Sequence, residues 1–191
     1  MLRHLSRHAA ALVLAVTAAQ SDYAGAAAWT VDPAASEVAF QYQRDGDPAT
    51  GYFRAFSGKG RFEALSPEDA TLEIRIKAAS IDLLEPLASA FATSSEWFDA
   101  KNHPEIVYQL SSLTMIKPGT FAAAGDLTVR GKTKRIVSEI VLNAGTDGAS
   151  AEGELTIRRS EFDLGIGLST AFVEVGPMVT VRFQLAATTV K

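Results

Sequence analysis

The sequence predicts an all-β protein whose strands follow one another as an antiparallel meander. After residue 28, apolar and polar residues alternate over most of the chain, which is the period of a strand with one buried and one solvated face. Short turns that contain glycine separate successive runs, and such turns join antiparallel neighbours rather than the parallel strands of a βαβ fold. The hydrophobic content of 47% is sufficient for the core of one domain.

Residues 1–28 are predicted to be a signal peptide that is cleaved near residue 28. Two arginines come first, residues 9–19 are mostly small and apolar, and residues 24–28 offer the small-x-small pattern of a cleavage site. The apolar run is shorter than the ~20 residues that a membrane-spanning helix needs. We therefore expect export to the periplasm, with residues 29–191 as the mature domain.

The clearest strand covers residues 71–77, where apolar and polar residues alternate without a fault. Leu72, Ile74 and Ile76 share one face, and three charged residues occupy the other, so this strand borders solvent on one side. Further strands are expected over residues 38–42, 106–110, 121–129, 136–142, 151–157 and 179–185, with hairpin turns at 117–119, 130–132 and 144–148.

Residues 82–100 break the alternation, because their apolar residues recur at roughly helical spacing. Pro86 suits the first turn of a helix, where its missing N–H costs nothing. Ser94 or Ser95 can cap a second short helix, which ends before Pro104. One or two short helices are expected here, where they would close one end of the strand assembly.

Several classes of function are disfavoured by the composition. The net charge of −4, without a cluster of Lys and Arg, argues against a nucleic-acid surface. Because the chain has no cysteine, it has no disulfide and no thiolate for catalysis or metal binding. His103 is the only histidine after residue 28, and we interpret Glu161 and Asp163 as a solvated face rather than a catalytic acid pair. The protein is therefore not expected to be an enzyme or to bind a metal or cofactor.

Six short segments carry a resemblance to a known family. In order, they are WTVDP with SEVAF from residue 29, FRAFSGKGRF from 53, ASID from 79, SEWFD from 95, GDLTVRGKTK from 125, and RSEF with GIG from 159. Each segment alone is weakly specific. Together, in this order across residues 29–189, they resemble the YceI-like family of bacterial periplasmic proteins.

The resemblance implies a lipocalin-like antiparallel β-barrel of about eight strands, with one or two short helices and an elongated apolar interior. Eight strands leave a lumen that is filled by side chains or holds one slender ligand. Members of the family bind isoprenoid chains, quinone-like or prenyl-phosphate molecules and other lipids, so the resemblance implies a bound polyisoprenoid, quinone or fatty-acid-type lipid. Residues 168–172 stand where many members carry a tryptophan, so the resemblance does not fix the head group.

Large residues on the expected inward faces are the candidate ligand contacts. Taken singly, each could equally be plain core, but as a set they suit an apolar pocket, which gains about 25 cal/mol per Å² of buried surface. Arg159 could bind a phosphate or carbonyl at the barrel mouth, or form a structural ion pair with Glu161, Asp163 or a residue of another strand. The candidates are Phe40, Tyr42, Phe53, Phe56, Leu72, Ile74, Ile76, Trp97, Phe98, Tyr108, Phe183 and Arg159.

Three functions remain open at this point. The leading hypothesis is a periplasmic carrier that holds one lipid or isoprenoid in the barrel. The second is a quinone-linked redox accessory to a membrane cytochrome, and the third is an interaction module whose filled barrel holds no ligand. A transient contact with a membrane or membrane cytochrome, and a homodimer, are compatible with these hypotheses.

Overall fold

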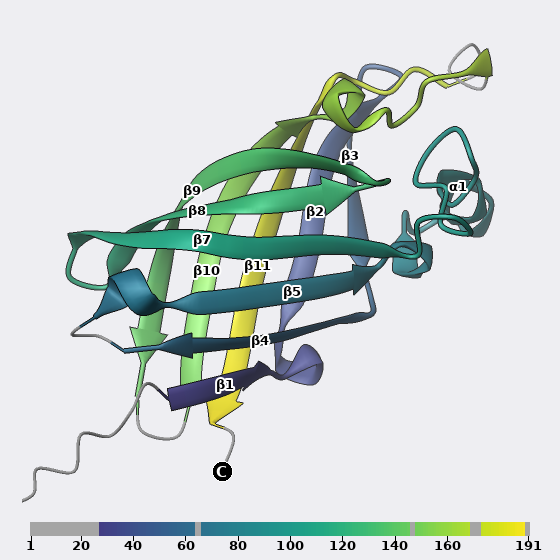
Figure 1. The fold of residues 1–191 in the computed structure, drawn as a ribbon. Coiled ribbons are helices and arrows are strands. Elements are labelled where there is room, and N and C mark those ends of the chain that lie inside the picture. Colours follow the sequence, from purple (N-terminus) through teal and green to yellow (C-terminus); the bar gives the residue numbers. More distant parts are fainter. Residues whose placement is uncertain (1–26, 64–65, 146–147, 169–172, 190–191) are drawn as a thin grey trace, which may run out of the picture.

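The computed structural model describes residues 27–63, 66–145, 148–168 and 173–189 (Figure 1). These residues form one antiparallel sheet that closes into a barrel, with one short α-helix at one end. The predicted all-β class is therefore confirmed. Among the described residues, no helix is long and apolar enough to cross a membrane.

Among the described residues, eleven strand segments, one α-helix and four 3₁₀ turns have defined bounds. They are β1 (Ala27–Val31), η1 (Pro33–Ala35), β2 (Glu37–Arg44), β3 (Asp47–Phe53), β4 (Phe56–Phe62), η2 (Pro67–Asp69), β5 (Thr71–Lys77), η3 (Ala78–Ser80), β6 (Ile81–Asp82), α1 (Pro86–Ala92), β7 (Glu105–Lys117), β8 (Thr120–Val129), β9 (Lys132–Ala144), β10 (Gly148–Arg158), η4 (Arg159–Phe162) and β11 (Met178–Thr189).

The eleven segments make eight barrel strands, because three strands are interrupted. Along one edge of β11, Ala187 pairs with Val31 of β1, and Gln184 pairs with Glu37 of β2, so β1 and β2 are one strand broken by η1. Likewise, β3 continues into β4, and β5 continues through η3 into β6. The ring β1-β4-β5-β7-β8-β9-β10-β11 closes through β1 and β11. The expected number of about eight strands is confirmed.

Most of the predicted signal peptide lies outside the described residues. Its last two residues, Ala27 and Ala28, belong to β1 and pair with Phe62 and Arg61. A cleavage after residue 26, where one small-x-small pattern ends, would keep both pairs, whereas a cleavage after residue 28 would remove them. The position of cleavage remains a prediction.

Two tight hairpins explain the course of the chain at one end of the barrel. Asp45 and Gly46 between β2 and β3 have φ of 53° and 86°, and Arg130 and Gly131 between β8 and β9 have φ of 49° and 72°. Two consecutive residues with positive φ are the mark of a type I′ loop, whose twist matches that of the flanking strands. The hairpin predicted at residues 130–132 is confirmed, while the one at 45–46 was not predicted.

The region in which one or two short helices were expected contains one helix. Pro86 opens α1, as expected. A second helix capped by Ser94 or Ser95 does not form, because the backbone there folds into consecutive turns. The N–H of Phe98 bonds back to the carbonyl of Ala92, Asp99 adopts a left-handed φ of 47°, and the Ser94 hydroxyl caps no helix. These backbone hydrogen bonds hold residues 93–99 against the C-terminal end of α1.

Towards one end of the barrel, two gaps open in the strand ladder. Pairs between β9 and β10 stop at Ile140 and Gly153, and η4 lies between the two strands beyond that point. On the other side, β6 pairs with β3 alone among the strands with defined bounds, and α1 packs against β6. The segments 83–104 and 159–168 therefore stand at the same end of the barrel, which we call the mouth (Figure 1).

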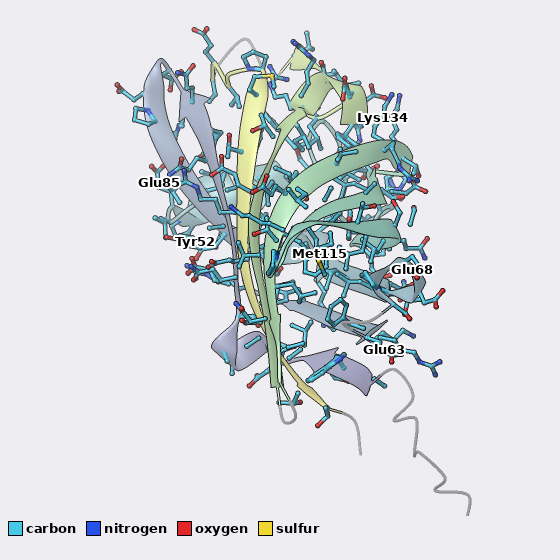
Figure 2. All side chains as sticks on the ribbon, turned by 90° about the vertical axis from the view of Figure 1, so that its left-hand side faces the viewer. Tyr52, Glu63, Glu68, Glu85, Met115 and Lys134 are labelled. Carbon is cyan, nitrogen blue, oxygen red and sulfur yellow. The ribbon has the colours of Figure 1, made fainter. Side chains whose placement is uncertain are left out.

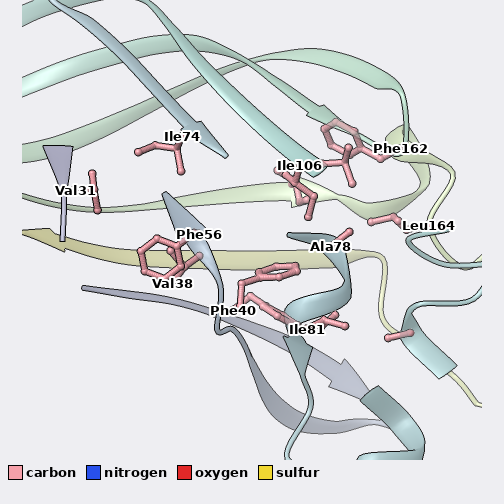
Figure 3. Packing of buried hydrophobic residues seen from close by; sticks show 14 residues of the cluster. Val31, Val38, Phe40, Phe56, Ile74, Ala78, Ile81, Ile106, Phe162 and Leu164 are labelled. Atoms are coloured by element: carbon pink, nitrogen blue, oxygen red, sulfur yellow. The ribbon is translucent and has the colours of Figure 1, made fainter. Parts of the chain in front are cut away.

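The buried side chains form two clusters along the barrel. The larger cluster takes residues from most strands, and Figure 3 shows Val31, Phe40, Phe56, Ile74 and Ile106 pointing into a common interior. Charged groups lie outside, as Figure 2 shows for the carboxylates and ammonium groups at the periphery. The smaller cluster, which we call the floor, lies at the other end of the barrel and consists of Leu113, Phe121, Ala123 and Ile140.

Candidate ligand-binding site

The barrel encloses a cavity of about 920 Å³ that runs between the mouth and the floor. Its walls come from all eight barrel strands, and α1 contributes Leu87, Ala88 and Phe91 at the mouth. This volume lies at the upper end of the ~300–1,000 Å³ that is usual for small-molecule sites. The lining is predominantly aliphatic and aromatic, so the cavity suits a long apolar molecule.

Eleven of the twelve predicted site residues border this cavity. Ile74 is the most buried of the β5 residues, with 6% of its surface exposed, as the alternation predicted. Phe56 is the exception, since it packs within the larger cluster and does not border the cavity. The residues that border it are Phe40, Tyr42, Phe53, Leu72, Ile74, Ile76, Trp97, Phe98, Tyr108, Arg159 and Phe183.

A row of four aromatic rings lines one wall near the mouth. The ring centroid of Phe40 lies 5.8 Å from that of Tyr42 and 5.4 Å from that of Phe53. Phe53 meets Phe98 edge-to-face at 5.7 Å. Such pairs contribute about 0.5–1.5 kcal/mol each beyond simple burial, so these contacts stabilise the wall.

Inward-facing glycines hold two of the cavity's rings against the wall. Gly51 is the cross-strand partner of Phe40, and Gly153 is the partner of Phe183. A Cβ atom on Gly153 would approach the Cζ of Phe183 to 2.7 Å, and a Cβ on Gly51 would overlap the Phe40 ring. Each ring therefore lies over a glycine where a side chain would otherwise stand, which leaves the centre of the lumen open.

Arg159 is at the mouth, but its donors face the backbone rather than a carboxylate. Its Nη1 donates to the carbonyls of Leu164 at 2.7 Å and Gly165 at 3.1 Å, and its Nη2 donates to that of Val175 at 3.0 Å. Its Nε is shared between Val175 and Gly176. Among the described residues, no carboxylate lies within 4.0 Å of this guanidinium. The alternative of a structural ion pair with Glu161, Asp163 or another strand is therefore wrong for the described residues, and Asp163 pairs with Lys132 at 2.5 Å.

These contacts leave Arg159 partly available to a ligand. Arginine has five N–H donors, and the bonds to the loop carbonyls use four of them. One Nη2 donor has no acceptor among the described residues, and the guanidinium carbon lies 5.8 Å from the centre of the Trp97 ring. The residue can therefore brace the loop and still offer one charged donor to a polar head group at the mouth.

The sequence model of the YceI-like domain matches residues 29–187. The chain belongs to the YceI-like family. Among its relatives are UPF0312 proteins of Ectopseudomonas mendocina, 28% identical over 63% of this chain and 66% of the relative, and of Pseudomonas fluorescens, 32% identical over 61% and 66%. The matched parts thus span just under two thirds of these two relatives.

Solved structures show the same barrel. Burkholderia cenocepacia BcnA superposes with a TM-score of 0.76 at 27% identity and covers 83% of this chain and 99% of its own. A Saccharophagus degradans domain, described as polyisoprenoid-binding and implicated in plant cell wall breakdown, superposes with a TM-score of 0.70 at 14% identity, covering 86% and 99%. At 14% identity the second likeness shows the fold alone.

Two tryptophans of this YceI-like barrel, each with a buried indole nitrogen, were not predicted as a pair. Trp29 borders the cavity away from the mouth, and Trp97 borders it at the mouth. The indole Nε1 of each is buried and has no hydrogen-bond partner among the described residues. An unpaired buried donor costs about 1–3 kcal/mol, which a polar group of a bound molecule or a water could recover. The sequence marked Trp29 only as part of a family motif.

Arg130 and His103 both lie near the mouth and do not border the cavity. Arg130, in the β8–β9 hairpin turn, is half-buried, and its guanidinium donates to the carbonyls of Asp163 and Ser95. It thereby ties the β8–β9 turn to both segments of the mouth. His103 lies outside the cavity, with its Nε2 3.9 Å from Asp99. Within the described ranges, no group of His, Asp and Glu side chains is arranged to hold a metal.

Burial also changes the acidity of the two cavity tyrosines. Desolvation raises the pKa of Tyr108, with a smaller opposing effect from Arg135. Burial likewise raises the pKa of Tyr42, and the nearby Arg44 partly offsets this. Both hydroxyls are therefore neutral at physiological pH and can act as hydrogen-bond donors to a ligand, not as charged groups.

Proposed function

We propose that this YceI-like protein is a periplasmic carrier that holds one long apolar molecule, an isoprenoid, quinone-like or fatty-acid-type lipid, inside the barrel. The observation that carries the proposal is the apolar cavity of about 920 Å³ bordered by all eight strands. Rings folded onto Gly51 and Gly153 keep its centre open, which a filled core would not require. We propose binding without chemical conversion.

The ends of the cavity support an amphiphilic ligand. The mouth offers the spare Nη2 donor of Arg159 and the polar ends of Tyr42, Arg44 and Glu85, whereas the interior beyond them is predominantly apolar. A polar head at the mouth and an apolar tail towards the floor would satisfy both regions. The description of the Saccharophagus degradans domain as polyisoprenoid-binding agrees with this class of ligand.

The first experiment asks whether the protein carries a lipid. The protein is purified from the exported fraction without detergent, extracted with organic solvent, and the extract is analysed by mass spectrometry. A carrier yields about one lipid molecule per chain. Turnover of an added quinone would favour the redox accessory, and an empty protein that captures a partner would favour the interaction module.

The intact mass of the same sample tests export, because a retained full-length chain contradicts the cleaved signal peptide.

The second experiment blocks the lumen while leaving the strand intact. Ile74 faces the cavity from the middle of β5, so Ile74→Trp is expected to place its ring in open space, to fold normally and to abolish lipid retention. In a filled core the same change would overpack the interior by about 1–3 kcal/mol. Lys77→Trp, on the exposed face of the same strand, is the matched control and should retain lipid. Failure of Ile74→Trp to fold, with no lipid from the wild type, would refute the carrier.

A further inference from the structure

The mouth of the barrel carries an exposed apolar surface that the enclosed ligand does not explain. Of the nine large apolar side chains that are exposed among the described residues, five lie on the two segments of the mouth. We call them the rim: Leu84 (63% exposed), Leu87 (87%), Phe91 (42%), Ile166 (50%) and Leu168 (84%). Single exposed apolar residues are ordinary, but a group gathered at one end marks an interaction site.

The rim is continuous with the inside of the barrel. Leu87, Phe91 and Leu168 are exposed to solvent and also border the cavity, so apolar surface passes from the lumen to the exterior without a polar break at these positions. The two rim segments are bound together, because the N–H of Gly165 donates to the carbonyl of Glu96 at 2.9 Å. Figure 1 shows α1 and the segment after η4 projecting at the same end of the barrel.

Three basic groups near the rim are paired within the protein. Arg44 pairs with Glu85 at 3.1 Å, Arg54 with Asp82 at 2.8 Å, and Lys132 with Asp163. These three groups, which belong to the described residues, are therefore not free to bind anionic lipid head groups. Contact through the rim would depend on insertion of apolar side chains, which does not require a charged surface.

We propose that the rim docks the barrel mouth onto a lipid bilayer. Leucine and phenylalanine side chains on a short helix and a loop would enter the boundary between head groups and acyl chains, and the mouth would open directly onto lipid. The apolar ligand would then move between bilayer and lumen without crossing water. This role rests on the proposed carrier function, although the docking itself can be measured separately.

The test uses two rim residues that do not border the cavity. Leu84→Asn and Ile166→Asn are made singly and together, and Val137→Asn, on the exposed outer face of β9, is the matched control. Leu84 has a φ of 65°, a conformation that asparagine adopts readily, so the substitution fits the existing backbone. All chains are used as the producing cell processes them, so any effect of their common N-terminal residues is the same.

Binding is measured by co-sedimentation with phosphatidylcholine vesicles that contain no anionic lipid, at low and high NaCl. The wild type and Val137→Asn should bind equally, with little effect of salt. The double variant should bind at least about tenfold more weakly, equivalent to 1.4 kcal/mol, with each single variant between. No binding by the wild type, binding lost at high salt, or equal binding by the double variant would overturn the proposal. A folded double variant is verified by its thermal transition.

Lipid retained by each chain is measured in parallel, so the two proposals can fail separately. If the wild type carries lipid but does not bind vesicles, the carrier stands and the docking rim fails. If vesicle binding depends on the rim but no lipid is carried, the rim stands and the carrier fails. If the double variant loses vesicle binding and still retains lipid, both proposals are supported.

Discussion

The two ends of the barrel are built from the same kinds of residue in opposite arrangements. At the floor, Phe62 and Phe121 meet edge-to-face at 5.8 Å, and the apolar side chains are buried against one another. At the mouth, leucines stand in solvent and Arg159 and Arg130 bind backbone carbonyls of loops. The floor is thus a conventional core that supports the fold, while the mouth is a braced opening. The same side-chain chemistry contributes to stability at one end and to access at the other.

The largest expected effect is at the floor. Phe121→Ala removes a ring that is 97% buried, so the free energy of unfolding should fall by about 3–5 kcal/mol. Phe91→Ala at the mouth is the matched control, and it should change stability little because that ring is partly in solvent. Denaturant unfolding of both variants measures the difference. Similar losses for the two variants would contradict the contrast between the ends.

The second-largest effect is expected at Arg159, whose hydrogen bonds hold the loops of the mouth. Arg159→Lys keeps the positive charge but loses the planar fork that reaches four loop carbonyls, so the free energy of unfolding should fall by about 1.5–3 kcal/mol. Arg158→Lys, one residue earlier and exposed on β10, should have almost no effect. If Arg159→Lys is as stable as the wild type but binds lipid less tightly, the residue serves the ligand rather than the loop.

A smaller and more selective effect is expected from Gly51→Ala. The added methyl group would displace the Phe40 ring from the wall into the lumen, so lipid binding should weaken by about tenfold while the barrel still folds. Lipid retention and thermal unfolding are measured together. The double variant Gly51→Ala/Phe40→Leu should regain part of the binding, because the smaller side chain restores the space. No recovery would indicate that the methyl group distorts the strand itself.

The smallest effect is expected at His103, which lies near the mouth but outside the cavity. Its Nε2 is 3.9 Å from an Asp99 oxygen, and more than a third of its side chain is exposed. His103→Ala should change the free energy of unfolding by no more than about 0.5 kcal/mol and leave lipid retention unaltered. Calorimetry and solvent extraction would detect a larger role. A tenfold loss of retained lipid would place this histidine in the binding machinery.

Local patterns in the sequence predicted the strands but not the details of the mouth. The alternation in residues 71–77 follows from one buried and one solvated face, so it identified β5 and its inward residues directly. The break between β1 and β2 depends on a three-residue turn in which the Asp32 side chain accepts from the N–H of Ala34, which leaves no period to detect. That β1 and β2 form one interrupted strand becomes clear from the pairing of both segments with β11.

Long-range contacts account for the remaining differences in the candidate site. The contacts of Arg130 could not be predicted, because its acceptors, Asp163 and Ser95, are 33 and 35 residues away in the chain. Gly51 and Gly153 acquire their meaning only from the register that places Phe40 and Phe183 opposite them. Such residues cannot be assigned a role until the strand pairing is known, because the neighbouring sequence does not indicate which residue lies opposite them.

The three interrupted strands divide the barrel into units that can open separately. The breaks at η1, residues 54–55 and η3 fall on adjacent strands, so β2, β3 and β6 form a flap joined to the rest mainly through β11. Amide hydrogens of the flap should exchange with solvent faster than those of the closed ring, because fewer ladder bonds must break to free them. The flap carries Phe40, Tyr42 and Phe53. A ligand packed against these aromatic side chains would slow hydrogen exchange in the flap and leave exchange in the other strands of the barrel unchanged. Loading of the barrel would then be visible as a change in the dynamics of three strands.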